Sequence, residues 1–178
     1  AVLSQDELAR ALAVRDLSDP ANGPHAVQLM HSKLIEALAQ RWHCQVMVHR
    51  ACPIISVHQN YERLRVPAES AARDARYTRY VDGTTLLRSS VTAMIPPLLD
   101  DLADEPAGYE VLLAPVGLVY RRDVIDRLHV GEPHQLDLWR VRRGAPRLDT
   151  ADLEEMIALV ASVIATCATV RCTTTEHP

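Results

Sequence analysis

The chain has 178 residues, 48% of them hydrophobic and 24% charged, which fits one globular domain large enough to bury a core. Its formal net charge of −4 argues against a strongly basic nucleic-acid-binding protein. There is no run of about 18 apolar residues and no apolar segment at the N-terminus, so neither a membrane span nor a signal peptide is predicted. We therefore expect a cytoplasmic location.

Two helices are predicted in the first quarter of the chain. Ser4 and Glu7 have the spacing of a capping box and open a helix over residues 4–15. After a turn-rich stretch, an apolar stripe at helical spacing predicts a second helix over residues 25–42. Trp42 closes this stripe, and we expect it in the core or at a dimer interface.

The middle of the chain favours short strands and irregular structure. Apolar, β-branched runs predict strands over residues 44–50 and 53–59. The stretch 60–80 is polar and irregular, and residues 82–83 form a tight turn that leads into a further strand.

The last part of the chain completes an α+β pattern. A short helix is expected within 92–105, and the apolar run 109–123 predicts a buried strand with residues 134–144 as its antiparallel partner. A final helix over 150–166 is opened by Asp149 or Thr150. It carries an apolar stripe of Leu153, Ile157, Val160 and Ile164. Helices, then strands, then a helix indicate the α+β class with an antiparallel sheet flanked by helices.

The four cysteines do not suggest a metal site. None belongs to a C-x-x-C pair, and zinc sites usually need two close pairs of ligands. We predict no metal held by the protein and expect reduced thiols. The cysteines are Cys44, Cys52, Cys167 and Cys172.

The stretch "GLVYRRDVIDRLHVGEPHQLDLW", residues 117–139, joins two apolar strands through a strongly charged tip. Period-two alternation gives each strand one polar face, formed by Val119, Arg121 and Asp123 on the first and Gln135, Asp137 and Trp139 on the second. If both faces point into one cleft, a guanidinium there can grip a phosphate, beside an amide, a carboxylate and an aromatic wall. The loop with Asp126 and His129 can fold over a bound nucleotide.

This stretch resembles motif 2 of class II aminoacyl-tRNA synthetases, in the form found in the phenylalanyl-tRNA synthetase alpha chain. That family reads roughly G-x-V-[FY]-R-x-[DE]-x-x-D-x-x-H-x-x-x-F-H-Q-x-E. The matching residues are Gly117, Val119, Tyr120, Arg121, Asp123, Asp126, His129, His134 and Gln135.

Further stretches resemble the same family. "NYERLRVPAESAARDARYTRY" is similar to N-[FY]-x-x-L-x-x-P followed by H-P-A-R-D-x-x-D-T-F-Y. The matching residues there are Asn60, Tyr61, Leu64, Pro67, Ala72, Arg73, Asp74, Thr78 and Tyr80. Residues 44–56 resemble the motif 1 strand, which in the family lies at a dimer interface. "LLRSSVTAM" resembles L-L-R-T-H-T-S-x-M, so the resemblance covers about residues 40–178.

The resemblance implies ATP-dependent activation of an amino acid, phenylalanine or a relative, to an aminoacyl-adenylate, with transfer to tRNA as the next step. It implies that Arg121 contacts the α-phosphate of ATP and that Asp123 and His129 help to hold ATP. Mg²⁺ neutralises the phosphates. Gln135 and Asp137 stand where the family reads the amino acid. Motif 1 implies a homodimer or a hetero-oligomer.

The chain departs from the family pattern in three places. Ser90 and Thr92 replace a histidine and a serine that help to bind the substrate, so the identity of the amino acid is open. Asp137 replaces a glutamate and shortens its reach by one methylene. No motif 3 is found. We expect residues 1–178 to form a single synthetase-like catalytic domain that is incomplete at its C-terminus, and we favour a fragment over a truncated paralogue because the sheet would otherwise expose an edge.

Two functions are therefore open. The first is an activating enzyme that binds ATP and an amino acid, with tRNA as a further partner. The second is a truncated or repurposed paralogue that binds a nucleotide, an amino acid or a protein without charging tRNA. Plainer interpretations also stand: Arg121 as one more exposed arginine, Asp126 as a local loop cap, His129 as a solvated loop residue and His134 as pointing away from the cleft.

Overall fold

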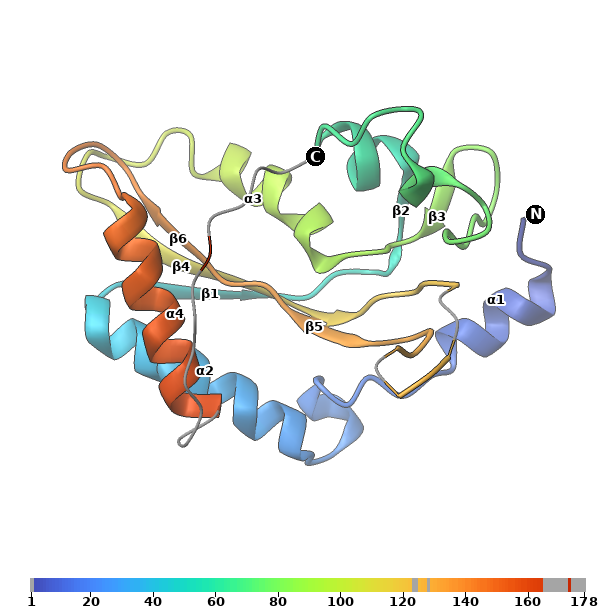
Figure 1. Cartoon of the computed structure of the whole chain (residues 1–178), viewed down its shortest axis with the longest axis horizontal. Coiled ribbons are helices and arrows are strands. Elements are labelled where there is room, and N and C mark those ends of the chain that lie inside the picture. The colour runs from blue at the N-terminus through green and yellow to red at the C-terminus, as the bar shows by residue number, and fades with distance from the viewer. Residues whose placement is uncertain (1, 123–124, 128, 165–172, 174–178) are drawn as a thin grey trace.

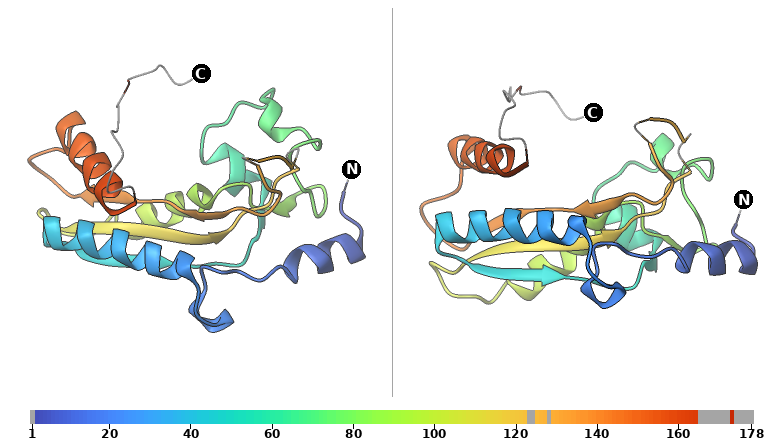
Figure 2. Two further views of the ribbon diagram at one scale, coloured as in Figure 1. Left: turned by 60° about the horizontal axis from the view of Figure 1, so that its bottom comes forward. Right: turned by 90° about the horizontal axis from the view of Figure 1, so that it is seen from below.

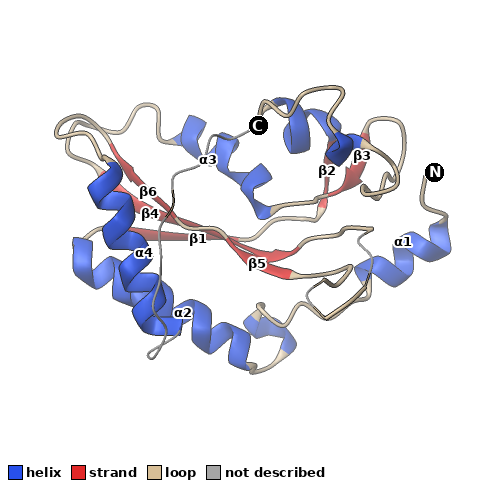
Figure 3. Cartoon of the chain, viewed as in Figure 1, coloured by secondary structure: helices blue, strands red, loops and turns tan. Residues whose placement is uncertain are grey.

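The computed structural model describes residues 2–122, 125–127, 129–164 and 173. One four-stranded sheet lies between helices on its two faces (Figure 1). Its strands are β1 (Gln45–His49), β4 (Glu110–Leu118), β5 (His134–Leu136) and β6 (Trp139–Arg142). The helices are α1 (Gln5–Leu12), α2 (Ala26–Trp42), α3 (Ile95–Asp101) and α4 (Thr150–Ile164). A two-stranded sheet of β2 (Ile54–Ser56) and β3 (Thr85–Leu87) lies beside them (Figure 3).

Strand β4 forms the centre of the molecule. Its nine residues are buried except at the first position, which confirms the predicted buried strand. Alternation along β4 sends side chains to two separate cores. Leu112 packs with Leu38 and Trp42 beneath α2 and α4, while Val111 and Leu113 pack beneath α3. Figure 2 shows α2 and α4 together on one side of the sheet, so β4 is covered on both faces.

The sheet is mixed and not fully antiparallel. Strands β5 and β6 pair antiparallel with β4, as predicted, but β1 pairs with it parallel. A parallel pair requires a long crossover, and the chain between β1 and β4 supplies one that contains β2, β3 and α3. The predicted α+β class, with an antiparallel sheet flanked by helices, is confirmed for β4, β5 and β6, and the parallel edge strand β1 is an addition to it.

The strand predicted over residues 134–144 is divided into β5 and β6 opposite Pro115, a proline of the facing strand β4. Both pieces share one register on β4, with Val116 opposite Leu136 and Leu113 opposite Trp139. Between them the Asp137 N–H donates to the Pro115 carbonyl at 3.0 Å. Pro115 has no N–H with which to return the bond, so the ladder is interrupted there.

Two further predictions need correction. The strand expected over 53–59 ends at Ser56. The hydroxyl of Ser56 accepts the N–H of Gln59 at 3.0 Å, and the chain then turns into a π-helix, His58–Glu62. In α4 the packed residues are Met156, Leu159 and Val160, whereas Leu153 and Ile164 are exposed. Helix α4 is fixed by polar contacts: Trp42 Nε1 donates to Glu155 at 2.9 Å, and Arg140 pairs with Asp152 at 2.8 Å.

The other elements agree with the sequence. Ser4 and Glu7 form the capping box of α1, with bonds of 2.7 and 3.2 Å. Asp149 caps α4 by accepting the N–H of Ala151 at 2.8 Å. The helix expected within 92–105 becomes a 3₁₀ turn over Val91–Met94 followed by α3, whose first turn contains both prolines. In the part of the chain that the structure describes, no helix is long and apolar enough to cross a membrane.

Candidate active site

A pocket of about 440 Å³ lies where β4 ends, between the segment 71–78 and the start of the 3₁₀ turn Val91–Met94. Arg121 enters it from the end of β4, where the Arg121 N–H donates to the Gly131 carbonyl at 2.8 Å. The size falls within the range of small-molecule sites, roughly 300–1,000 Å³. Its lining comprises Ala71, Ala72, Tyr77, Thr78, Ser89, Ser90 and Arg121.

Among the described residues, the side chain of Arg121 is held at one of its three nitrogens. Nε donates to the Ser89 carbonyl at 3.0 Å. Neither Nη atom has a hydrogen bond or an ion pair with any described residue. Because a guanidinium can present two parallel N–H groups, this leaves a fork of donors for a phosphate or carboxylate.

Ser89 is in turn fixed by Asn60, which is buried. Asn60 Oδ1 accepts the Ser89 N–H at 3.1 Å, and its Nδ2 donates to Ser89 Oγ at 2.9 Å. The carbonyl that orients Arg121 is therefore itself oriented by a buried amide. Asn60 matched the family pattern in the sequence, but that match alone gave it no role.

The opposite wall of the pocket is built around the carbonyl of Ala72. Tyr61 and Thr78 both donate their hydroxyl groups to this carbonyl at 2.7 Å, and the two hydroxyls also contact each other. The Arg73 guanidinium lies over the Tyr61 ring, 5.0 Å from its centroid. These contacts give the segment 71–78 a fixed position although it has little regular structure.

Three of the predicted substrate-binding residues form one network. Gln135 Oε1 accepts the Val91 N–H at 3.1 Å and the Ser90 hydroxyl at 3.3 Å. The hydroxyls of Ser90 and Thr92 are 2.8 Å apart. Ser90 also caps the 3₁₀ turn by accepting the Thr92 N–H. The structure thus brings Ser90, Thr92 and Gln135 together beside the Arg121 pocket.

Asp137 has a buried oxygen with no partner among the described residues. Oδ2 is fully covered, while Oδ1 accepts the neighbouring Leu138 N–H at 3.2 Å. An unpaired buried carboxylate oxygen is costly, and such atoms mark places where a donor is missing. Trp139, in contrast, lines a groove with Leu153 and Met156 beside α4 and is not part of the Arg121 pocket. The expected aromatic wall of the cleft is therefore wrong.

The remaining predicted residues lie apart from the pocket or outside the described residues. His129 Nδ1 pairs with Asp126 at 2.9 Å, both side chains are more than half exposed, and Asp126 also accepts the His129 N–H. Asp123 lies outside the residues that the structure describes. His134 points away from Gln135, as expected, and its Nε2 accepts the Leu17 N–H at 2.8 Å.

The described lining of the pocket suits an anionic group such as a phosphate better than it suits a bare metal ion. Its described lining offers a guanidinium, hydroxyls and backbone groups but no carboxylate. Across the described parts of the chain, no three His, Cys, Asp or Glu side chains gather in a way that would hold a metal. Mg²⁺ fits this site as an ion carried on phosphate oxygens, since Mg²⁺ prefers oxygen ligands and commonly binds through substrate phosphates.

The chain has the fold of a class II aminoacyl-tRNA synthetase. A pyrrolysyl-tRNA synthetase from Desulfitobacterium hafniense superposes with a TM-score of 0.61 at 18% identity, covering 89% of this chain and 52% of that one. A second structure of that organism's pyrrolysyl-tRNA synthetase gives a TM-score of 0.54 at 20% identity. At this level of identity the likeness establishes the fold alone.

The family follows from the sequence comparison. The family described as "tRNA synthetases class II core domain (F)" matches residues 19–178, and the chain belongs to it. The phenylalanine–tRNA ligase alpha subunit of Lactiplantibacillus plantarum is 35% identical over 107 residues, which are 60% of this chain and 29% of that protein. A probable mitochondrial phenylalanine–tRNA ligase of Drosophila melanogaster is 35% identical over 89 residues. The chain spans less than a third of the length of these relatives.

Proposed function

We propose that this chain activates an amino acid with ATP, giving an aminoacyl-adenylate and pyrophosphate, and that the amino acid is phenylalanine or a relative. The observation that carries the proposal is the Arg121 guanidinium, fixed at Nε by Ser89 with both Nη atoms directed to no described residue. Such a fork is pre-organised for a phosphate and needs no rearrangement when one binds.

The reaction needs alignment more than proton transfer. A carboxylate oxygen of the amino acid attacks the α-phosphorus, and the bond from that phosphorus to the bridging oxygen breaks to release pyrophosphate. The amino-acid carboxylate is already ionised at neutral pH, so no general base is required. Arg121 stabilises the negative charge that develops on the α-phosphate oxygens, and bound Mg²⁺ supplies additional charge neutralisation on the phosphates.

The amino-acid end of the site is assigned to the network of Ser90, Thr92 and Gln135, with Asp137 nearby in sequence. Asp137 is a proposed contact for the substrate ammonium group, and because its Oδ2 is covered in the structure, this contact requires a local movement that exposes the oxygen. Asp123 and His129 remain proposed ATP contacts. Their support is the family resemblance, since Asp123 is outside the described residues and His129 pairs with Asp126.

Transfer to tRNA and assembly through motif 1 belong to the same proposal. Strand β1 occupies an edge of the described sheet, and Val46 and Val48 on it are 40% and 50% exposed. Exposed β-branched residues on an edge strand favour pairing with another chain. We propose a homodimer or a hetero-oligomer joined through this strand.

The test is amino-acid-dependent exchange between ATP and pyrophosphate, measured with a panel of amino acids. Arg121→Ala is expected to lower kcat/KM at least about 100-fold, as removal of a charge-stabilising donor does. The control is Arg143→Ala, because Arg143 is an exposed arginine whose Nε donates to the Glu105 carbonyl at 3.1 Å and which does not line the Arg121 pocket. Exchange with one amino acid, lost in the Arg121 variant and kept in the control, supports activation. Absence of exchange with every amino acid contradicts it.

One observation favours the second function, a paralogue that binds without charging tRNA. The polar groups of Ser90, Thr92 and Gln135 bond to one another, which leaves fewer of them for a substrate. In that case, ATP binding persists in calorimetry and is weakened by Arg121→Ala, while no amino acid supports exchange.

A further inference from the structure

We propose that Arg79 is a positioning residue that holds the backbone of Arg121 in place for the reaction. The inference deepens the proposed function and rests on it for its kinetic part. Arg79 lies on the strand-like segment before β3 and is far from Arg121 in sequence. Its side chain is only 17% exposed.

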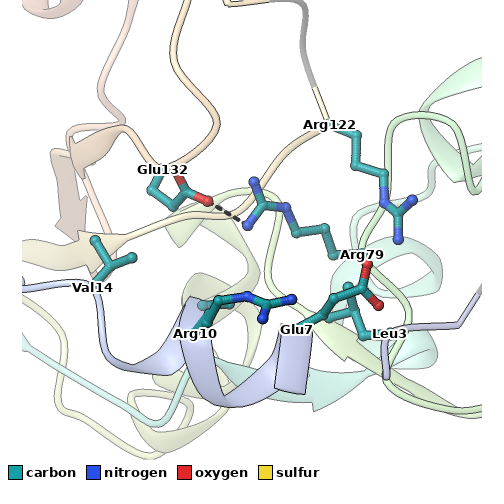
Figure 4. Close-up of a pocket in the computed structure, with 8 residues that line it drawn as sticks. Leu3, Glu7, Arg10, Val14, Arg79, Arg122 and Glu132 are labelled. Carbon is teal, nitrogen blue, oxygen red and sulfur yellow. Dashed lines mark ion pairs between the residues drawn. The ribbon is translucent and has the colours of Figure 1, made fainter. Parts of the chain in front are cut away.

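Arg79 joins the two ends of the chain segment that follows β4. Its Nε donates to the Arg121 carbonyl at 3.1 Å. Its Nη1 forms an ion pair with Glu132, marked by the dashed line in Figure 4. One guanidinium therefore contacts the residue at which this segment leaves β4 and the residue with which it returns toward β5.

Gly131 shows how closely this guanidinium is packed. A Cβ atom at position 131 would stand 2.6 Å from Arg79 Nη2 and 3.4 Å from the Arg121 carbonyl oxygen. No side chain fits there unless the guanidinium moves. Because that guanidinium is tied to Arg121 and Glu132, its movement would break at least one of the two contacts.

Arg121 is consequently fixed at three points. Its N–H donates to the Gly131 carbonyl at 2.8 Å, its carbonyl accepts from Arg79, and its side-chain Nε donates to Ser89. Of the three anchors, one is made by Arg79 itself and one by Gly131, against which the Arg79 guanidinium packs. Loss of Arg79 removes the anchor on the Arg121 carbonyl and leaves the backbone held by Gly131 and the side chain by Ser89. Small displacements of a phosphate-binding arginine reduce rate and affinity strongly.

Helix α1 covers this arrangement from the face away from the active site. A second cavity of about 440 Å³ separates α1 from Arg79, Arg122 and Glu132 (Figure 4). The Leu3 N–H donates to the Tyr80 carbonyl at 2.8 Å, which ties α1 to the residue next to Arg79. Arg121 and Arg122 are therefore oppositely directed, the first into the active-site pocket and the second toward α1.

The experiment compares Arg79→Ala, Arg79→Lys and Gly131→Ala with Arg143→Ala, an exposed arginine away from the pocket, in the full chain. Kinetics of ATP–pyrophosphate exchange give KM for ATP and kcat, and deuterium exchange reports the Arg121 amide independently of activity. We expect Arg79→Ala and Gly131→Ala to raise KM for ATP about tenfold and to accelerate exchange of that amide. Arg79→Lys keeps the charge opposite Glu132 but lacks the second donor that reaches the Arg121 carbonyl. Its KM for ATP and its amide exchange rate should therefore lie between those of the wild type and of Arg79→Ala.

Unchanged KM for ATP and unchanged amide exchange in a folded Arg79→Ala protein overturn the proposal. A uniform loss of activity in proportion to the unfolded fraction, with KM unaltered, also overturns it, because that result describes a purely structural residue. If the wild type shows no exchange of ATP with pyrophosphate, the proposed function fails. The deuterium-exchange comparison still decides whether Arg79 holds Arg121.

Discussion

The guanidinium of Arg88 lies directly against Gly117 near the end of β4, where a Cβ atom would stand 2.4 Å from Nη2. Arg88 is 3% exposed and donates to the Leu118 carbonyl at 2.8 Å and to the Ala51 carbonyl at 2.9 Å. Burial lowers the pKa of Arg88. A buried guanidinium thus ties β4 to the segment after β1, and the missing side chain at Gly117 provides its space.

Gly117→Ala is expected to destabilise the fold by about 2 kcal/mol or more, because the new methyl group displaces a buried, hydrogen-bonded charge and the backbone φ is +150°. Urea denaturation measures the loss. The matched control is Gly83→Ala, since no atom lies within 4 Å of a Cβ placed there. Equal stability of the two variants would show that Arg88 moves aside at little cost.

Gln135 offers a test of the amino-acid end of the site. Gln135→Leu removes the acceptor of the Val91 N–H and the Ser90 hydroxyl, so we expect a loss of about 1–2 kcal/mol in stability and a higher KM for the amino acid. Gln135→Glu keeps an acceptor oxygen and should retain more of the stability. Thermal denaturation and exchange kinetics measure the two effects.

The control for this position is Gln40→Leu, an exposed glutamine on α2. The idea fails if Gln135→Leu changes neither the melting temperature nor the KM for the amino acid. A change in KM for ATP alone would instead assign Gln135 to the nucleotide.

Asp137 can be tested through its buried, unpartnered Oδ2. Asp137→Asn has nearly the same shape but carries no charge to attract a substrate ammonium group. We expect KM for the amino acid to rise about tenfold or more with KM for ATP unchanged, and stability to stay within about 1 kcal/mol of the wild type. If Asp137→Asn is much more stable than the wild type and its kinetics are unchanged, the Asp137 carboxylate destabilises the fold and does not contact the substrate.

Local signals in the sequence were sufficient for most elements of the fold. The capping box of Ser4 and Glu7 and the stripe that ends at Trp42 each depend on neighbours within a few residues, so a single sequence contains the information. The same holds for the buried run of β4. The family resemblance also pointed to Arg121 and Gln135, from motif 2, and to Ser90, from "LLRSSVTAM", and these residues lie in one region of the structure.

The features that were missed depend on contacts between distant residues. The rotation of α4 is set by Glu155 and Asp152 meeting Trp42 and Arg140, and no local pattern encodes that meeting. Likewise, the parallel pairing of β1 with β4 depends on the path of all the residues between these two strands, which no local pattern encodes. Arg79 looked like one arginine among many, because its partners Arg121 and Glu132 are more than 40 residues away along the chain.

Asp82 predicts how stability depends on pH. Its Oδ1 accepts the N–H groups of Thr84 and Thr85, each at 2.7 Å, and the Thr84 hydroxyl at 3.0 Å. These bonds, with that from the Thr84 N–H the strongest, lower the pKa of Asp82 from 3.8 to about 2. A carboxylate whose pKa is lower in the folded state stabilises the fold fully above its unfolded pKa and loses this contribution as pH falls through the folded value.

We therefore expect the stability advantage of the wild type over Asp82→Asn to be constant above about pH 5 and to shrink between pH 4 and pH 2. Asparagine keeps an acceptor oxygen for the turn but does not titrate, which isolates the charge. Denaturant titrations at steps of half a pH unit measure the difference. The control is Asp101→Asn, an exposed carboxylate on α3 with no hydrogen bond or ion pair to the described residues. A difference between wild type and Asp82→Asn that stays constant down to pH 2.5 would mean that the three bonds to Asp82 do not discriminate between its charged and neutral forms.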